Sequence, residues 1–303
     1  MKILFCADGS EASYYAIRKS LPFLHRNDQI DIIHIIDWGL LPTYVTFPAE
    51  EEIRYPEEKN IAQKILDKAI ELIEAEGYSV RKADYFHGKP AKIILEVITE
   101  EGYDIVVLGS HGKKGIRKWL GSVSRKVVTK SSIPILIVRP PDEPEKGVFV
   151  GTKDVLFAVD GSEYSYHAVK QAISILNLDN SSVEITTIRP GAESLPLEIT
   201  MDNEWLQDCL RKQKEIANEI LENTKLILQE HNIPVKSAFS LEGNAADVIL
   251  NYIEEHKQDL VVMGSHGREG ISDFLLGSVS KRVLDYATSP VLIIPIKGMS
   301  IHK

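Results

Sequence analysis

The sequence predicts an α/β protein built from two similar domains, each with a doubly wound parallel sheet. Two observations indicate this. Apolar segments of strand length alternate along the chain with amphipathic segments of helical period. The series of segments in residues 1–140 also recurs in residues 154–297. Strands that alternate with helices join through right-handed crossovers into a parallel sheet, with helices on both of its faces.

Matched stretches reveal the duplication directly. ILFCADGSE at 3–11 corresponds to VLFAVDGSE at 155–163. VVLGSHGKKGIRKWLGSVS at 106–124 corresponds to VVMGSHGREGISDFLLGSVS at 261–280, and an apolar strand follows each copy. A repeat of this length in a chain of 303 residues indicates two domains. Residues 141–153, rich in proline, glycine and charge, form the expected linker.

In the first domain each expected element has a local reason. The first strand is nearly all apolar, as in a strand covered on both faces, and Ser10 in the following turn is a typical helix N-cap. Gly77 and Gly102 end the second and third helices, and Pro90 stands at the start of the third. The long proline-containing connection 38–56 is of the kind that often forms a lid or a contact surface. The expected strands are Lys2–Ala7, Ile30–Ile36, Val80–Phe86, Ile105–Leu108 and Ile135–Val138, and the expected helices are Glu11–Leu24, Glu57–Glu76, Ala91–Glu101 and Ser122–Lys130.

The second domain repeats the series in the same order. Its expected strands are Val155–Val159, Val183–Ile188, Lys236–Leu241, Leu260–Met263 and Val291–Pro295. Its expected helices are Tyr164–Leu176, Asn203–Gln229, Ala245–Glu255 and Ser278–Tyr286.

Composition argues against several classes of protein. The net charge of −9 disfavours nonspecific binding to nucleic acid or to an anionic membrane, so neither partner is expected. The first apolar run ends at Asp8, too early for a signal peptide, and no run reaches the ~18 residues of a membrane span. Cys6 and Cys209 are far apart and belong to no CxxC motif. We therefore expect a cytoplasmic protein with reduced thiols.

Two loops of the second domain carry residues suited to a ligand. Asp160–Ser162 follows the first strand, and Gly264–Ser278 follows the fourth. In open α/β sheets ligands bind beyond the carboxyl ends of the strands, so these loops form one site if the two strands are neighbours. A carboxylate suits ribose hydroxyls or an adenine amino group. Backbone N–H groups at a glycine-rich turn and a helix start suit phosphate oxygens. A carboxylate in one loop and backbone N–H donors in the other together indicate an adenine nucleotide as the ligand.

The glycine spacing in this loop is G-x2-G-x9-G-S. It differs from the P-loop, which needs a lysine before its Ser/Thr, and from the dinucleotide fingerprint G-x-G-x-x-G. A tight turn that binds nothing is the alternative for a single glycine-rich stretch. The recurrence of the stretch in both domains favours a binding site.

Asp-Gly-Ser-Glu after the first strand, with Gly-Ser-His-Gly and Gly-Ser-Val-Ser after the fourth, resembles the universal stress protein family. The resemblance covers nearly all of the chain as two tandem domains. It implies a Rossmann-like, five-stranded sheet ordered 3-2-1-4-5 in each domain, and nucleotide binding as in one subgroup. It also implies dimer contacts through the fifth strands. We expect the apolar strands 135–138 and 291–294 to pair within the chain as a pseudo-dimer, with a further homodimer as an additional assembly.

The resemblance also implies which residues bind the nucleotide, either ATP or AMP. In the second domain they are Ala158, Asp160, Ile188, Met263, Gly264, Gly267, Gly277, Ser278 and Val279. The counterparts in the first domain are Cys6, Asp8, Ile35, Leu108, Gly109, Gly112, Gly121, Ser122 and Val123. Ile188 would pack on the adenine, and Met263 and Gly264 would line the base and ribose side. The residues around the phosphates would be Gly267, Gly277, Ser278 and Val279. A Mg²⁺ ion would be held by phosphate oxygens and Ser278.

The first domain departs from this pattern in one respect. Eight residues separate Gly112 from Gly121, where nine separate Gly267 from Gly277. A shorter loop would move the helix start relative to the phosphates, so the second site is the better match. Lysines and arginines in the shorter loop, at 113, 114, 117 and 118, would offset phosphate charge or form a solvated basic face.

Several candidate residues have two interpretations. His111 and His266 lie inside the glycine turns, where a catalytic base would need an orienting partner, and a loop hydrogen bond is the simpler interpretation. His34 is interpreted as structural. Asp8 and Asp160 would act either on the nucleotide or as helix caps. No grouping of histidine, cysteine and carboxylates has metal-ligand spacing.

The leading hypothesis is therefore a stress-related regulatory protein that binds ATP or AMP and signals by a change of shape or partner. A slow ATP hydrolase is the second hypothesis, and an interaction scaffold with empty sites is the third. The missing P-loop lysine argues against turnover, so we expect no enzyme or at most a weak ATPase. The complete glycine spacing at 264–278 argues against an empty second site.

Overall fold

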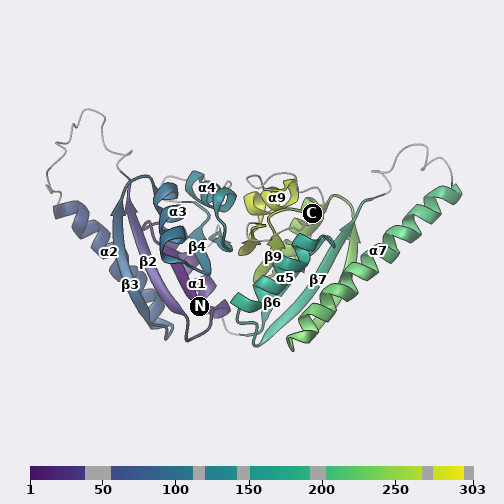
Figure 1. Ribbon diagram of the computed structural model, residues 1–303, viewed down its shortest axis with the longest axis horizontal. Coiled ribbons are helices and arrows are strands. Elements are labelled where there is room, and N and C mark those ends of the chain that lie inside the picture. Colours follow the sequence, from purple (N-terminus) through teal and green to yellow (C-terminus); the bar gives the residue numbers. More distant parts are fainter. Residues whose placement is uncertain (38–55, 112–119, 142–150, 192–202, 268–275, 297–303) are drawn as a thin grey trace. The chain divides into compact units, whose positions relative to one another are not determined.

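The computed structural model describes residues 1–37, 56–111, 120–141, 151–191, 203–267 and 276–296. The chain divides into two compact units, Met1–Lys146 and Gly147–Lys303. Each unit contains a parallel sheet with helices packed against it, as Figure 1 shows. The sequence-based prediction of two doubly wound α/β domains is therefore confirmed.

In the first unit the strands follow the predicted order 3-2-1-4-5. The strands are β1 (Lys2–Cys6), β2 (Gln29–Ile36), β3 (Val80–His87), β4 (Ile105–Gly109) and β5 (Ile135–Val138). The helices are α1 (Glu11–Ser20), the 3₁₀-helix η1 (Leu21–Phe23), α2 (Pro56–Ala75), α3 (Pro90–Glu101) and α4 (Ser122–Lys130). β1 pairs with β2 on one side and with β4 on the other, and both pairs are parallel. β3 and β5 complete the order β3-β2-β1-β4-β5.

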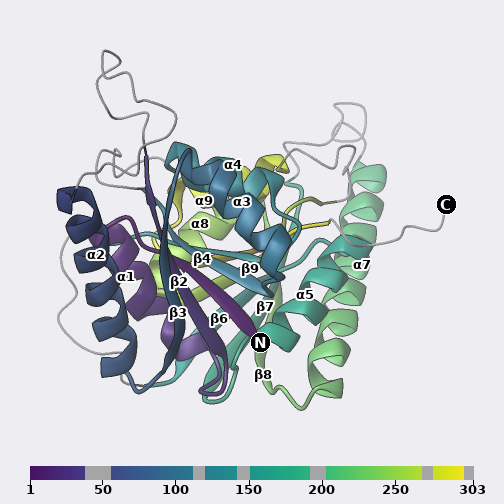
Figure 2. The same ribbon diagram turned by 60° about the vertical axis from the view of Figure 1, so that its left-hand side comes forward.

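Helices cover both faces of this sheet. α1 packs against β4 and β5, and α2 packs against β2 and β3. α3 packs against α4 and β2. Figure 2 brings the first unit forward and shows α1 and α2 on one side of β1–β3 with α3 on the other. Because the helices cover the two faces, the turns that follow the strands lie at the carboxyl edge of the sheet.

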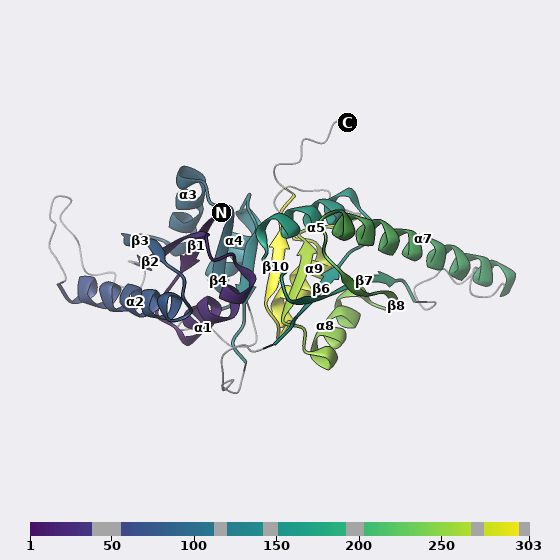
Figure 3. The same ribbon diagram turned by 90° about the horizontal axis from the view of Figure 1, so that it is seen from below.

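The second unit repeats the architecture. Its strands are β6 (Lys153–Ala158), β7 (Ser181–Arg189), β8 (Val235–Glu242), β9 (Leu260–Gly264) and β10 (Val291–Ile294). Its helices are α5 (Glu163–Ile175), α7 (Asn203–Glu230), α8 (Ala245–His256) and α9 (Ser278–Tyr286). β6 pairs in parallel with β7 and β9, giving the order β8-β7-β6-β9-β10. Figure 3 shows α5 and α7 on one side of this sheet and α8 on the other.

The central strands form the core of each unit because they are covered on both faces. Phe5 on β1 and Phe157 on β6 are among the largest fully buried side chains. Their neighbours on the strands are equally inaccessible, with Leu4 and Leu156 both 0% exposed. Such continuous apolar strands are typical of parallel sheets.

One predicted helix ends early. The expected helix Glu11–Leu24 stops at Ser20, and a 3₁₀ turn with Pro22 at its second position follows. Proline has no N–H to donate and its ring clashes with the preceding turn, so the α-helix cannot continue through it. Ser10 is the N-cap, as predicted, and its hydroxyl accepts from Ser13 N at 3.2 Å. The ends of the other expected elements agree within about two residues.

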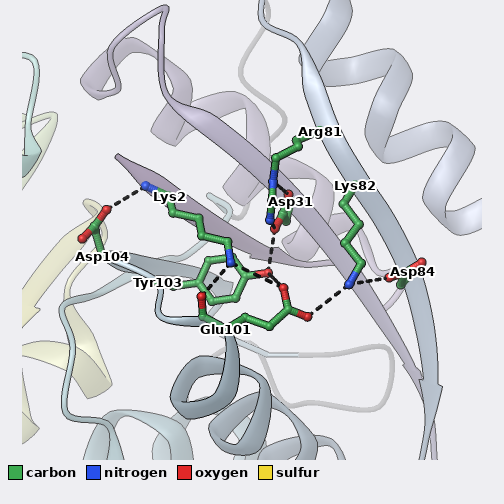
Figure 4. Close-up of polar contacts among 8 residues, drawn as sticks. All are labelled: Lys2, Asp31, Arg81, Lys82, Asp84, Glu101, Tyr103 and Asp104. Carbon is green, nitrogen blue, oxygen red and sulfur yellow. Dashed lines mark hydrogen bonds and ion pairs between the residues drawn. The ribbon is translucent and has the colours of Figure 1, made fainter.

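At the amino end of the first sheet a buried carboxylate is fully paired. The Asp31 side chain is 1% exposed. Arg81 Nε donates to Asp31 Oδ1 at 2.9 Å, a second Arg81 nitrogen donates to Oδ2, and the Tyr103 hydroxyl donates to Oδ2 at 2.7 Å (Figure 4). Lys2 Nζ lies 4.3 Å from the centre of the Tyr103 ring and donates to the Glu101 carbonyl. An unpaired charge at this depth would be costly, and the cluster prevents that.

The second unit satisfies a buried carboxylate with a different set of residues. Glu184 on β7 takes the place of Asp31 on β2 and is 6% exposed. Glu184 Oε2 accepts from the Tyr252 hydroxyl at 2.8 Å and from Gln258 Nε2 at 2.9 Å. Glu184 Oε1 accepts from the Ser237 hydroxyl at 3.0 Å. The tyrosine has moved from the segment after the third helix in the first unit to α8 in the second.

These contacts set the charge state of Glu184. Burial raises the pKa of its carboxyl, but hydrogen bonds from Tyr252, Ser237 and Lys236 lower the pKa by more, so it lies below its usual range. Burial and the nearby carboxylate raise the pKa of the Tyr252 phenol. A carboxyl whose pKa is lowered on folding stabilises the fold above the unfolded pKa. That stabilisation is lost as the pH falls through the lowered pKa of the folded protein.

We expect Tyr252→Phe to lower the free energy of unfolding by about 1–3 kcal/mol at pH 7, because a charged acceptor loses one donor. The difference from the wild type should shrink at acidic pH, once the pH falls below the usual pKa range of a glutamate and the carboxyl takes up a proton. Urea unfolding of the full chain at pH 7 and at acidic pH measures this difference in free energy. Tyr166→Phe is the control, since the Tyr166 hydroxyl makes no hydrogen bond with any residue that the structure describes. A difference that does not vary with pH would contradict this account of Glu184.

Candidate functional site

The predicted site residues of the second unit gather where three neighbouring strands end. β6 lies between β7 and β9, with Ala158 opposite Thr186 and Phe157 opposite Val262. The strands are parallel, so their carboxyl ends meet at one edge of the sheet. The adjacency of strands one and four, which the sequence alone left open, is thereby established.

The turn after β6 is held by its own aspartate. Asp160 Oδ1 accepts from Ser162 N at 3.0 Å and from the Ser162 hydroxyl at 2.6 Å. Gly161 adopts a φ of 80°, a left-handed conformation that glycine tolerates. Ser162 in turn caps α5, because its hydroxyl oxygen accepts from Ser165 N at 3.1 Å. The helix cap is therefore the serine, and the alternative interpretation of Asp160 as the cap is wrong.

The turn after β9 is closed by the start of α9. Ser265 N donates to Ile294 O at 2.8 Å, which extends the strand pairing by one residue. Gly277 N donates to Ser265 O at 2.9 Å, and the Ser280 hydroxyl donates to Gly264 O at 2.8 Å. Two hydrogen bonds thus hold the first turn of α9 against the turn that follows β9.

The two turns are in direct contact. A methyl group built on Gly267 would lie 2.5 Å from Asp160 Oδ2. Carbon and oxygen atoms that are not bonded do not approach so closely, so a side chain at Gly267 would displace the carboxylate. Glycine at this position lets the backbone of the β9 turn lie against the acidic turn of β6.

The neighbouring glycines make room for protein backbone. A Cβ on Gly264 would lie 3.2 Å from the carbonyl oxygen of His266, and one on Gly277 would lie 3.4 Å from that of Ser265. The contact at Gly264 is tight and that at Gly277 is ordinary. Part of the G-x2-G-x9-G-S spacing is therefore explained by the closing of this turn.

The remaining predicted residues of the second unit surround the same edge. Ala158 ends β6, Ile188 lies one residue before the end of β7, and Met263 precedes the last residue of β9. Ser278 and Val279 are the first residues of α9, where backbone N–H groups have no acceptor within the helix. An anion placed there would meet N–H donors and the positive end of the helix dipole.

The first unit has the same frame. Ser10 N donates to Asp8 Oδ1 at 2.9 Å, Gly121 N donates to Ser110 O at 2.6 Å, and the Ser124 hydroxyl donates to Gly109 O at 2.8 Å. The other predicted residues lie at the ends of β1, β2 and β4 and at the start of α4, namely Cys6, Ile35, Leu108, Ser122 and Val123. Gly112 and the basic residues of the shorter loop lie outside the described residues, as does the connection 38–55.

Two differences separate the first site from the second. A Cβ on Gly109 would lie 2.9 Å from the backbone of Ala12, so α1 approaches the end of β4 very closely. Cys6 stands where the second unit has Ala158, and burial, helped by Asp8, raises the pKa of the Cys6 thiol. The first site therefore carries a neutral thiol where the second carries a methyl group.

The histidines of both glycine turns are tied to the preceding serine. His111 Nδ1 lies 2.9 Å from the Ser110 hydroxyl, and His266 Nδ1 lies 3.0 Å from the Ser265 hydroxyl. This agrees with the loop hydrogen bond predicted for them. His34 is buried and its Nδ1 lies 2.7 Å from Ala7 O, as expected of a structural histidine.

Sequence reasoning missed the serines that lock the turns. Ser280 and Ser124 occupy the same position in the two units, and each bonds to the carbonyl of the glycine that ends strand four. Their signal in the sequence is the last residue of the repeated GSVS. The spacing of the glycine-rich motif does not indicate that this serine bonds to the end of strand four.

The described residues contain neither a membrane-spanning helix nor a metal-binding cluster. No helix there combines the length and the apolar character that crossing a membrane requires. The same part of the chain holds no group of three or more histidine, cysteine or acidic side chains arranged to bind a metal ion.

Comparison with solved structures supports the fold. A universal stress protein from Archaeoglobus fulgidus superposes with a TM-score of 0.62, covering 97% of this chain and 98% of that one, at 20% identity. A protein of unknown function from Pseudomonas aeruginosa gives a TM-score of 0.61 over 97% and 92% of the two chains, at 16% identity. At these identities the likeness concerns the fold alone.

Sequence comparison identifies the family. The universal stress protein of Mycolicibacterium smegmatis is 28% identical over an alignment 309 positions long, which covers 96% of each chain. The protein MJ0531 of Methanocaldococcus jannaschii is 32% identical over 142 residues, 47% of this chain and 81% of its own length. The profile of the Universal stress protein family matches residues 1–139 and again residues 151–295. The chain therefore belongs to the universal stress protein family, as a member with two tandem family domains.

Proposed function

We propose that the protein is a stress-related regulatory protein that binds an adenine nucleotide, ATP or AMP, in its second unit. The observation that carries the proposal is the contact between the turn of Asp160 and the turn of Gly267, at the carboxyl ends of adjacent strands. A carboxylate and a set of backbone N–H donors then face the same volume. That pairing suits a ligand with hydroxyl or amino groups at one end and phosphate at the other.

The two oxygens of Asp160 have different tasks in this proposal. Oδ1 accepts two hydrogen bonds from Ser162, and these hold the turn. Oδ2, on the side of Gly267, accepts from a ribose hydroxyl or from the adenine amino group. The turn that fixes Oδ1 thus orients Oδ2 before the nucleotide arrives, and a preorganised acceptor loses less entropy on binding.

The other residues would enclose the nucleotide from two sides. Ile188 and Met263 offer apolar contact for the base, and Ala158 leaves room beside them. Gly277, Ser278 and Val279 offer the start of α9 to the phosphates. For Mg²⁺, the exposed hydroxyl of Ser278 would supply one ligand, and phosphate oxygens would supply the others.

The first unit is proposed as the weaker site. It shares the aspartate turn and the lock between strand four and the next helix. It differs in its shorter loop after Gly112 and in the thiol of Cys6, which is larger than the methyl group of Ala158. Both differences fall on positions that would contact the ligand.

The pairing of the fifth strands also remains a proposal. β5 and β10 are apolar, and each is the last strand in the order of its own unit, paired on one side with β4 or β9. An apolar edge strand tends to pair with another strand. Pairing β5 with β10 within one chain would give partners to the unpaired N–H and C=O groups of both edges. A further homodimer is a separate proposal.

The nucleotide proposal predicts that purified protein retains an adenine nucleotide, which denaturation releases for chromatography. We expect Asp160→Asn to lower retention about tenfold, because a charged acceptor is lost while the shape of the side chain is kept. Asp8→Asn, the same change at the matched position of the first unit, should leave retention nearly unchanged. Equal retention in the wild type and Asp160→Asn would refute the proposed site. No retention in any of the three would favour the scaffold hypothesis.

The same proposal predicts binding without turnover. The sequence lacks the lysine that a P-loop uses on the phosphates, so a developing charge would go without that stabilisation. Stoichiometric protein incubated with ATP and Mg²⁺ should release at most one phosphate per site. Phosphate release that continues over many turnovers, and that Asp160→Asn abolishes, would support the hydrolase hypothesis instead.

A further inference from the structure

A groove lies beside the edge strand of the second unit. It has a volume of about 460 Å³ and runs between β8 and α8. Its lining residues are Ser237, Phe239, Leu241, Val248, Asn251, Tyr252, Glu255 and His256. The volume is enough for several side chains of a peptide.

One edge of β8 is open to a further strand. β8 pairs with β7 through residues 235–242 and stands last in the strand order of its unit. No strand of the described residues pairs with its other edge. An edge strand presents unpaired N–H and C=O groups, which another extended chain can use.

The first unit provides an internal comparison, because β3 occupies the same place there. Lys82 Nζ lies 3.0 Å from a carboxylate oxygen of Asp84 and 3.1 Å from one of Glu101, so ion pairs line that edge (Figure 4). Charged side chains are the usual protection of an edge strand against further pairing. The registers of the two sheets place Ser237 where β3 has Lys82, and Phe239 where it has Asp84. β8 therefore has no charge at these two positions, and its ion pairs, of Lys236 with Glu184 and of Glu242 with Arg189, lie toward the two ends of the strand.

Aromatic rings form the floor of the groove. The Phe239 ring lies 4.9 Å from the Tyr252 ring, and the Tyr252 ring stacks on His256 at 3.9 Å. The Tyr252 hydroxyl is anchored on Glu184, so the ring has a fixed position. Rigid apolar floors of this kind bind an inserted side chain with little loss of entropy.

One carboxylate lines the α8 side of the groove. Glu255 is exposed and has neither an ion-pair nor a hydrogen-bond partner among the residues that the structure describes. A basic group carried by the occupant would gain a favourable interaction here, and an acidic group would be repelled.

We propose that this edge is a peptide-binding site: an extended segment of a partner protein adds as a strand to β8. Its alternate apolar side chains enter the groove over Phe239, and a flanking basic side chain meets Glu255. Strand addition between an edge strand and a helix is a recurring mode of peptide recognition, in which main-chain hydrogen bonds give affinity and pockets give specificity. The proposal is independent of nucleotide binding.

A defined probe tests the site on the full chain. The probe is a fluorescein-labelled peptide, Arg-Leu-Thr-Leu-Thr-Leu-Arg, titrated by fluorescence anisotropy. Saturable binding is expected, and the same peptide with glutamate at both ends should bind at least tenfold more weakly. Absence of saturable binding of the basic peptide, or equal affinity for both peptides, would overturn the proposal.

Matched variants locate the binding. Phe239→Asp gives β8 the residue that β3 carries, and it should weaken binding at least tenfold. Ala238→Asp adds the same charge to the same strand on the opposite face, where Ala238 is exposed, and should leave binding unchanged. Glu255→Lys changes an exposed side chain, and it should reverse the preference between the basic and the acidic peptide. Unchanged binding in both Phe239→Asp and Glu255→Lys, with folding checked by circular dichroism, would refute the site.

Two further measurements separate this proposal from its rivals. N-methylation of the peptide nitrogens on the edge that faces β8 should abolish binding, while methylation of the opposite edge should not. Equal effects of the two would exclude strand addition. A dimer in sedimentation that Phe239→Asp dissociates and that the probe does not compete with would show that a second copy occupies the edge.

Discussion

The contact between the Asp160 turn and the Gly267 turn is the constraint on which the second unit's candidate site depends. It exists because β6 and β9 are hydrogen-bonded neighbours, so the turns that follow them emerge side by side. A Cβ at 267 would overlap Asp160 Oδ2, so a side chain there would force the carboxylate to move. The start of α9 is then held by Gly277 and Ser280, which brings its N–H groups to the same edge.

The two units show what the duplicated frame requires and where it is free to vary. Both keep the aspartate turn and the serine lock between strand four and the last helix. Both bury a carboxylate on the second strand, but one pairs it with Arg81 and Tyr103, whereas the other uses Tyr252 and Gln258. The third strands also differ, since Ser237 and Phe239 of β8 stand where β3 carries Lys82 and Asp84.

Much of the fold could be predicted because the alternation of strands and helices is strong and occurs twice. The early end of α1 was not predicted, although Pro22 signals it. Proline is also common in the first turn of a helix, so its position alone did not show that a separate 3₁₀ turn begins there. For the site, spacing identified the glycines but not their neighbours. A Cβ on Gly277 would lie 3.4 Å from the carbonyl oxygen of Ser265. This contact depends on the three-dimensional path of the turn, which a local sequence pattern does not encode. The Phe239 groove was missed because it needs the register of β8 and the position of α8 together.

Hydrogen–deuterium exchange of the full chain, with and without ATP, tests the central claim most directly. If the two turns form one site, the backbone amides of 160–165 and of 264–267 should gain protection together, along with those at the start of α9. Protection should saturate at the same nucleotide concentration in all three segments. Bound nucleotide that protects only one of these segments, or none of them, would contradict the account.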